Sequence, residues 1–448
     1  MNMWFLLAAG LMAATLFIHC YFGGRRVVPP LLKSEDLGEV PKTIHYGNWH
    51  VATIVFVGMT LNFLWAATHP DALELAVFST LVAAAISVWA AVVILRQKQS
   101  FKRILHWLFF LLIAAAGTAG LATSYVAADD CAAPSFECAL APFSNDKHGD
   151  LHSVIVIQNG ETLVEHYYSG GDRQTLVDVR SAGKSVTSLL FGIALDRGAI
   201  TSLDDTVAKY WPNAAGSAIG SVRLADILTM RTGLDADGNN PDSLGYEDHM
   251  DEADDPLGFA LTIPRLDEPG TRYRYNSLAA YITGVVIGRA TGGGLESFAR
   301  NNLFKPLEFA HWNWQEDRAG QTKGQGNLFL TAPDFARIGQ LVLNSGSYNG
   351  QQVVSENWIE ESLKRRVDVS AYESNAVGYG FYWFYQTYTV HGRKIAVSFA
   401  SGNGGNKIYV IPELNMVVSV MSRAYGQGRG QRRSENILKA ILAATNQR

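Results

Sequence analysis

Two things are scarce in this sequence: cysteine throughout the chain, and charge in its first 128 residues. With 3 cysteines among 448 residues, a disulfide-dense small domain is excluded. The formal net charge of −4 at pH 7 provides no basic surface, so we expect no nucleic-acid partner. A hydrophobic content of 48% excludes a disordered chain. The H-E-x-x-H motif of zinc peptidases is absent, and we expect neither a metal nor an organic cofactor.

The charged residues are distributed unevenly along the chain. Residues 1–128 contain 8 Lys+Arg and 5 Asp+Glu, whereas residues 129–448 contain 29 and 36. The low charge of the first part is typical of a segment in lipid, and the second part has the composition of a water-soluble domain. We therefore expect a membrane region over residues 1–128, a linker over 129–150 and a soluble domain over 151–448.

Four apolar stretches in the first part are long enough to cross a bilayer as helices, which takes about 20 residues. They cover residues 3–21, 49–68, 72–95 and 104–128. Buried helices of a soluble bundle would need polar faces at helical spacing, and LVAAAISVWAAVVIL has none. The first part is therefore predicted to be an all-α transmembrane bundle of four helices, with the lipid bilayer as its partner.

Basic residues predict the orientation of this bundle, because short cytoplasmic loops are enriched in Lys and Arg. All eight lie in the loops after the first and third stretches: Arg25, Arg26, Lys33, Lys42, Arg96, Lys98, Lys102 and Arg103. The N-terminus and everything after Ala128 are then expected outside the cytoplasm of a bacterial inner or plasma membrane. A second interpretation remains open, in which the last stretch is a signal peptide cleaved after Ala128.

The cysteines agree with an external location of the second part. Cys131 and Cys138 lie close together just after the fourth stretch, and in an oxidising compartment they are a candidate disulfide. Two unpaired thiols are the alternative. Cys20 lies in the first apolar stretch and is expected to act as a small apolar residue.

A serine and a lysine open an amphipathic helix in the second part. Apolar residues recur at helical spacing from Val186 onwards, and Lys184 follows Ser181 at a distance that places both on one helical face. A helix cap would explain Ser181 alone, whereas the pair suits a nucleophile and its proton acceptor. A second S-x-x-K match, Ser144 to Lys147, precedes no apolar helix and is assigned to the linker.

The surroundings of Ser181 resemble the serine β-lactamase and penicillin-recognising family, and in particular its class C, carboxylesterase and 6-aminohexanoate-oligomer hydrolase branch. Further stretches resemble that branch in the same order: residues 222–234, 269–293, 326–346 and 399–422. The resemblance implies an α/β (α+β) β-lactamase/transpeptidase-like domain, in which an antiparallel sheet is flanked by helices and a helical subdomain closes over the site.

The resemblance also implies the catalytic residues. Ser181 is the expected nucleophile, Lys184 its partner and Tyr275 the third catalytic residue, with Tyr273 as the rival position. Either Lys184 or Tyr275 can be the base, and the sequence leaves this open. The expected two-step acyl transfer passes through an acyl-enzyme on Ser181.

The expected substrate contacts depart from the family pattern at two places. Asn276 and Ser277 follow the tyrosine, so the chain has Tyr-x-Ser where the family has Tyr-x-Asn. Where the family has Lys-Thr-Gly, the chain has Ala400, Ser401 and Gly402, which keeps a hydroxyl and close backbone approach but lacks the cation that holds a substrate carboxylate. The backbone N–H groups of Ser181 and Asn403 form the oxyanion hole implied by the resemblance.

The function expected from these residues is a membrane-tethered, extracytoplasmic serine hydrolase that acts on an ester or amide. The missing cation disfavours a dedicated β-lactamase or D-alanyl-D-alanine peptidase. Two alternatives remain: a penicillin-recognising membrane sensor or binding protein that is acylated without turnover, and a structural module with a decayed site.

Overall fold

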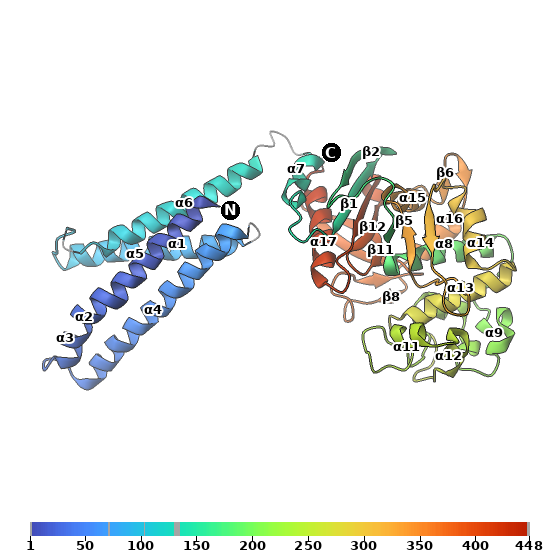
Figure 1. Ribbon diagram of the computed structural model, residues 1–448, viewed down its shortest axis with the longest axis horizontal. Helices are drawn as coiled ribbons and strands as arrows, with labels where there is room; N and C mark the ends of the chain where they lie inside the picture. The colour runs from blue at the N-terminus through green and yellow to red at the C-terminus, as the bar shows by residue number, and fades with distance from the viewer. Residues whose placement is uncertain (1, 70–71, 103, 130–134, 446–448) are drawn as a thin grey trace. The chain divides into compact units, whose positions relative to one another are not determined.

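The computed structural model describes residues 2–69, 72–102, 104–129 and 135–445. For residues 124–129 it describes the backbone only. The chain divides into two compact units, Met1–Ala133 and Pro134–Arg448. Figure 1 shows an all-helical first unit and a mixed second unit built around a sheet. Each unit is described by itself.

Four helices of the first unit are long and apolar enough to cross a membrane: Met3–Lys33, Glu39–Thr68, Leu73–Arg96 and His106–Thr123. The elements are α1 (Met3–Ile18), a π-helical turn (His19–Gly23), α2 (Gly24–Arg26), α3 (Val28–Lys33), α4 (Glu39–Thr68), α5 (Leu73–Arg96) and α6 (His106–Asp129). The first helix extends beyond the apolar stretch, so Arg25, Arg26 and Lys33 lie on helical turns rather than in an open loop. Prolines at the start of α3 permit this continuation, because a proline is tolerated in the first turn of a helix.

The side chains of this unit are arranged in the way expected for a bundle in lipid. Its interior contains small and aromatic residues, including Phe5 and Phe63 with no exposed surface. At Gly120 a Cβ atom would lie 2.4 Å from the Phe5 ring, so only glycine allows the two helices to approach there. Large apolar side chains such as Trp89, 65% exposed, face outwards. In a water-soluble domain the large apolar side chains would be buried. Their outward position here supports the prediction of four membrane-spanning helices.

The second unit is organised by an eight-stranded antiparallel sheet with strand order β2-β1-β13-β12-β11-β10-β9-β8. The strands are β1 (Leu151–Gln158), β2 (Glu161–Tyr167), β8 (Val367–Asp368), β9 (Gly378–Tyr379), β10 (Phe384–Val390), β11 (Arg393–Gly402), β12 (Asn406–Ile411) and β13 (Met416–Ser422). β12 and β13 are buried along their whole length, because helices cover both faces of the sheet. The Asn159-Gly160 dipeptide is a strong hairpin signal in the sequence, and the structure has a hairpin there: both residues have positive φ between paired strands β1 and β2.

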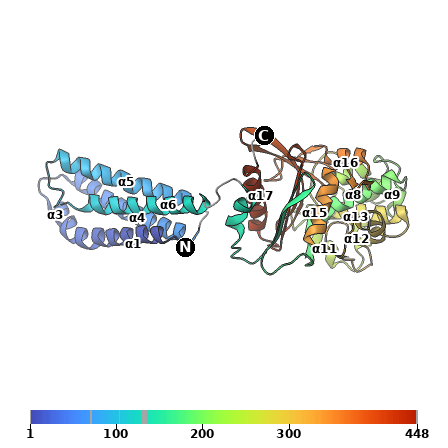
Figure 2. The ribbon, with the colours of Figure 1, turned by 90° about the horizontal axis from the view of Figure 1, so that it is seen from above.

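Helices on the two faces of the sheet fix the position of the site. Figure 2 shows α17 (Gly428–Ala443) on one face, with α15 (Ala332–Leu343) and α8 (Gly183–Asp196) on the other. The α15 face is closely packed, since a Cβ at Gly339 would lie 2.6 Å from side chains of β12 and β13. α8 is almost entirely buried, and it packs against β11 and against α13 (Ser277–Thr291).

The helical subdomain expected beside the sheet is present. It contains α9 (Val207–Tyr210), α10 (Leu224–Leu228), α11 (Glu247–Glu252), α12 (Pro256–Thr262), α13 and α14 (Leu295–Ala299). A three-stranded sheet, β3 (Val177–Asp178), β5 (Leu328–Leu330) and β4 (Trp312–Trp314), adjoins the nucleophile region. The remaining elements are α7 (Phe136–Leu140), β6 (Ser347–Tyr348), β7 (Gln351–Gln352) and α16 (Glu356–Leu363).

Part of the expected linker is packed onto the second unit. Leu140 at the end of α7 is 1% exposed and belongs to the core. Arg433 of α17 pairs with Asp146 at 2.9 Å and with Asp150 at 2.6 Å. Burial alone would raise the pKa of Asp150, but Arg429 and Arg433 outweigh it and hold that pKa below its ordinary value.

The disulfide prediction falls at the boundary between the units. Cys138 lies in α7 and is disulfide-bonded, whereas its expected partner Cys131 lies outside the described residues. The pairing of these two residues therefore stays a prediction. Cys20 is a free, exposed thiol in the π-helical turn.

We expect Arg433→Met to lower the free energy of unfolding by about 3–5 kcal/mol, because it leaves a buried carboxylate without its cation. The side chains of Arg433 and Asp146 are only 15% and 6% exposed. The measurement is the thermal denaturation midpoint of the full chain in detergent. Arg432→Met, at the neighbouring exposed position, is the matched control and should leave the midpoint unchanged. Equal midpoints for both variants would contradict the role given to this ion pair.

Candidate functional site

The nucleophile candidate Ser181 lies in a short 3-10 turn, Arg180–Ala182, directly before α8. Arg180 has a φ of 51°, in the left-handed region that a residue with a Cβ rarely adopts. The Asp178 carboxylate stabilises this conformation by accepting the Arg180 backbone N–H at 2.8 Å. The N-cap residue of α8 is Ala182, and no side chain caps it. Ser181 is therefore not a helix cap, and the alternative explanation for its position is removed.

Lys184 connects the nucleophile to two other parts of the chain. Its Nζ lies 3.0 Å from Ser181 Oγ, 3.2 Å from Ser277 Oγ and 2.9 Å from the carbonyl oxygen of Gln325. The side chain is 1% exposed. A buried amine with three oxygen partners is held in one position, and that position is against the serine, as predicted.

The two tyrosine candidates differ in their surroundings. Tyr275 lines the pocket next to Ser181, and its ring faces Lys184 Nζ at 5.2 Å from the ring centroid. Tyr273 is 5% exposed and donates to Glu373 at 3.2 Å. Burial and the nearby Glu373 carboxylate raise the pKa of Tyr273 well above its ordinary value. The geometry thus favours Tyr275 over Tyr273 as the third member.

Asn276 and Ser277 have separate roles. Asn276 is 1% exposed and caps α13: its Oδ1 accepts the Ala279 N–H at 2.7 Å, and its amide donates to the Arg274 carbonyl at 2.8 Å. These contacts give Asn276 a structural role, so its predicted substrate contact is not supported. Ser277 lines the pocket and accepts from Lys184, as expected of a residue in the site.

Strand β11 forms the opposite wall of the site. Its pairing with β10 ends at Phe384 and Phe399, and Ser401 borders the pocket beyond that pair. A Cβ at Gly402 would lie 2.0 Å from the carbonyl oxygen of Val179, in the turn that carries the nucleophile. Asn403 lines the pocket and its Oδ1 accepts the Gly426 N–H at 2.8 Å. Gly402 is thus packed against the segment that carries the nucleophile, and its predicted contact with the substrate stays a prediction.

These groups surround a cavity of about 510 Å³. Its walls include two carboxylates, and no Lys or Arg side chain lines it among the residues that the structure describes. Burial raises the pKa of one of them, Glu373, although the Tyr273 hydroxyl and the charge of Lys407 act in the opposite direction. The lining residues are Ser181, Gly238, Asn239, Tyr246, Glu247, Tyr275, Ser277, Glu373, Ser374, Asn375, Phe384, Ser401, Asn403, Gly426, Gln427, Gly428 and Gln431.

Lys407 is a residue of this site that the sequence analysis missed. It lies on β12 directly opposite Ser401, and its Nζ lies 2.7 Å from Ser401 Oγ. A buried amine on the neighbouring strand thus contacts Ser401, although it does not itself line the cavity. The glycine pair at 404–405 is a turn signal that would have placed residues 401 and 407 opposite each other, had the strand register been worked out.

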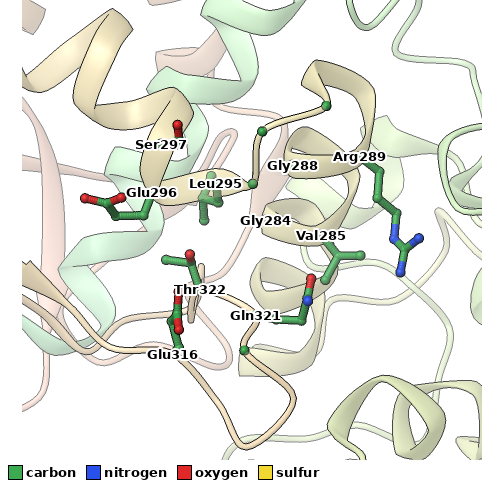
Figure 3. A pocket seen from close by; sticks show the side chains of 14 residues that line it. Gly284, Val285, Gly288, Arg289, Leu295, Glu296, Ser297, Glu316, Gln321 and Thr322 are labelled. Carbon is green, nitrogen blue, oxygen red and sulfur yellow. The ribbon is translucent and has the colours of Figure 1, made fainter.

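A second cavity, of about 490 Å³, lies along α13 away from the nucleophile (Figure 3). Gly284, Gly288 and Arg289 form one wall, about 10 Å or more along the helix from Ser277 at 1.5 Å per residue. One of its two carboxylates, Glu296, accepts hydrogen bonds from Arg300 at 2.6 Å and from the Trp312 ring N–H at 3.1 Å. Among the described residues that line this cavity, no serine or threonine hydroxyl is hydrogen-bonded to a lysine or a carboxylate.

The other sequence candidates lie outside the site. Ser144, of the second S-x-x-K match, donates to the Ala141 carbonyl at 2.7 Å in the segment after α7. Across the described ranges, no cluster of three or more His, Cys, Asp or Glu side chains is placed to hold a metal ion.

Comparison with known proteins gives one consistent answer. The sequence profile described as "Beta-lactamase" matches residues 148–442. A 6-aminohexanoate-dimer hydrolase of Paenarthrobacter ureafaciens is 26% identical over 47% of this chain and 56% of its own length. A beta-lactamase of Escherichia coli (strain K12) is 27% identical over 43% of this chain and 49% of its own length. The chain thus spans about half the length of these curated relatives.

Solved structures agree on the fold. A family VIII carboxylesterase covers 68% of this chain and 96% of its own length with a TM-score of 0.54 at 17% identity. At that identity the likeness shows the fold alone.

We expect Gly402→Ala to destabilise the protein by about 1–3 kcal/mol, because the added methyl group overpacks the contact with the nucleophile turn. Labelling of Ser181 by a fluorophosphonate probe should slow as the turn is displaced. Both the thermal midpoint and the labelling rate are measured. Gly293→Ala is the matched control, since a Cβ there meets Ser297 Oγ at an ordinary 3.7 Å. An unchanged midpoint and labelling rate for Gly402→Ala would show that the strand does not restrain the turn.

Proposed function

The chain belongs to the beta-lactamase family, whose members are serine hydrolases, and we propose that it hydrolyses an ester or amide through an acyl-enzyme on Ser181. One observation carries the proposal: Lys184 Nζ lies 3.0 Å from Ser181 Oγ at a pocket that Tyr275 also lines. A serine is a weak nucleophile unless a neighbouring base removes its proton, and Lys184 is in position to do so when its amine is neutral.

The reaction follows from this arrangement. Ser181 Oγ bonds to the acyl carbon while its proton passes to Lys184, and the carbonyl oxygen becomes negatively charged. The carbon–leaving-group bond then breaks, and the leaving group takes a proton from the Lys184 and Tyr275 pair. Water attacks the acyl-enzyme by the same route in reverse, which releases the acid and restores the Ser181 hydroxyl.

The backbone N–H groups of Ser181 and Asn403 would stabilise the negative oxygen. Both residues line the pocket, one on the nucleophile turn and one at the end of β11. A single donor of this kind contributes roughly 10²- to 10³-fold in rate. The contact of Gly402 with the turn brings these two segments together.

The charges of the pocket indicate which substrates it accepts. Its lining carries Glu247 and Glu373, and the position of the family's strand cation is Ala400. A substrate carboxylate close to the acyl group would be repelled, whereas a neutral or amine-bearing ester or amide would not. The similarity to a 6-aminohexanoate-dimer hydrolase supports an amide of this kind.

We also propose that the enzyme is tethered to a membrane with its second unit outside the cytoplasm. The four apolar helices support this topology, and so does the confinement of the basic residues of positions 1–128 to the segments after the first and third apolar stretches. A membrane-bound sensor that is acylated once without turnover is the competing function, and the same helices are the observation that favours it.

Turnover of p-nitrophenyl butyrate by the full chain in detergent should depend on Ser181. We expect Ser181→Ala to reduce the rate at least 10³-fold, because no nucleophile remains to form the acyl-enzyme. Ser144→Ala, the matched control from the second S-x-x-K match, should retain full activity. Stoichiometric labelling of Ser181 by a fluorophosphonate without turnover would support the sensor, and turnover unaffected by Ser181→Ala would contradict both functions.

The topology is tested by proteolysis of intact bacterial spheroplasts that express the chain with a C-terminal epitope. If the second unit lies outside, added proteinase K should remove the epitope before the cells are lysed. A cytoplasmic protein serves as the control for intact cells. Protection of the epitope until lysis would contradict the proposed orientation, and a soluble fragment beginning after residue 128 would contradict the tether.

A further inference from the structure

Ser401 and Lys407 form a directly opposed pair across β11 and β12. Opposed residues of antiparallel strands project from the same face of a sheet, so the hydroxyl and the amine meet. The connection between the strands is short: Gly404 and Gly405 both have positive φ, and the Gly405 N–H bonds back to the carbonyl of Gly402 at 3.2 Å. This tight turn fixes the register and with it the contact.

The lysine of this pair is buried, whereas the serine faces the cavity. Lys407 is 1% exposed, and its Nζ lies 2.7 Å from Ser401 Oγ and 4.8 Å from the centroid of the Phe399 ring. Ser401 lines the active-site cavity, whereas Lys407 does not. The lysine therefore reaches the substrate site only through the serine.

A buried amine is costly, and its charge is compensated only in part. The carboxylates that act on Lys407 are Glu373, on the loop before β9, and Glu435 of α17. Glu373 accepts from Tyr273 at 3.2 Å, and Glu435 pairs with Lys439 at 2.7 Å. Both carboxylates thus have other partners, and among the described residues the Lys407 amine forms its hydrogen bond with Ser401.

We propose that Lys407 is a positioning residue of this site: its ammonium group occupies a lone pair of Ser401 Oγ and so directs the Ser401 proton into the cavity, toward an oxygen of the bound ester or amide. An ammonium group can only donate, so the serine must act as acceptor toward it and keeps its own proton for the substrate. The inference rests on the proposed hydrolase function and adds a residue to that site.

The protonation state of Lys407 should then control the direction of this hydroxyl. Burial lowers the pKa of Lys407 to about 7, although the charges of Glu373 and Glu435 oppose the shift. Below this pH the ammonium donates and the serine faces the substrate. Above it the neutral amine has a lone pair, so Ser401 can donate to Lys407 and turn its proton away from the cavity.

The test compares Lys407→Arg and Lys407→Met with the wild type in kcat and KM for p-nitrophenyl butyrate between pH 5.5 and 9. Arginine stays protonated throughout this range. The ratio of wild-type to Lys407→Arg kcat/KM should therefore fall about five- to tenfold as the pH rises through 7, which is the effect of one hydrogen bond. Taking this ratio cancels any pH dependence that the two proteins have in common.

Lys407→Met should lower kcat/KM about tenfold at pH 6 in the wild type and less than twofold in a Ser401→Ala background, because the lysine acts through the serine. Lys394→Met, an exposed lysine of β11, is the matched control and should leave the profile unchanged. A pH-independent ratio, or equal losses in both backgrounds, would show that Lys407 only packs the strand and would overturn the inference.

The rate at which a fluorophosphonate labels Ser181 is followed in parallel in every variant, because it requires acylation but not turnover. If the wild type is labelled but does not turn over the ester, the proposed hydrolase fails while the Lys407 effect is still read from the labelling rate. If the wild type turns over the ester and Lys407→Arg leaves the pH profile unchanged, only this inference fails.

Discussion

The site depends on one buried amine. Lys184 Nζ contacts the nucleophile, the first residue of α13 and a backbone carbonyl from the loop before β5. These groups are distant in sequence, so the helical subdomain and the sheet must be docked correctly before the lysine has its partners. An uncompensated amine in the interior would be costly, and this cost links the folding of the second unit to the geometry of its chemistry.

Two glycines that contact the backbone beside Ser181 determine how closely the segments around the site approach each other. Gly402 packs on the carbonyl of Val179. A Cβ atom added to Gly326 would lie 3.0 Å from the carbonyl oxygen of Arg180. Both contacts bear on the turn that carries Ser181. The unusual backbone conformation of Arg180 is therefore held from two sides, as expected where surrounding structure maintains local strain at a functional position.

The two units have different packing patterns. In the first, small residues and aromatic rings fill the interior and large apolar side chains face outwards; in the second, apolar residues fill the space between sheet and helices. Close packing of this kind, with a glycine against Phe5, is what helix association in lipid would require, because lipid offers no hydrophobic driving force. Part of the predicted linker follows the second pattern, since α7 and the Asp146–Arg433 pair attach it to the soluble core.

Local pattern was enough to predict the four apolar helices, the hairpin at Asn159-Gly160 and the serine and lysine on one helical turn, because periodicity and spacing are properties of neighbouring residues. The resemblance to a known family indicated Tyr275 and Gly402. Tertiary structure alone decided the rest. The capping role of Asn276 depends on where α13 begins, and the place of Lys407 depends on strand register, which joins residues by pairing across a sheet rather than by order along the chain.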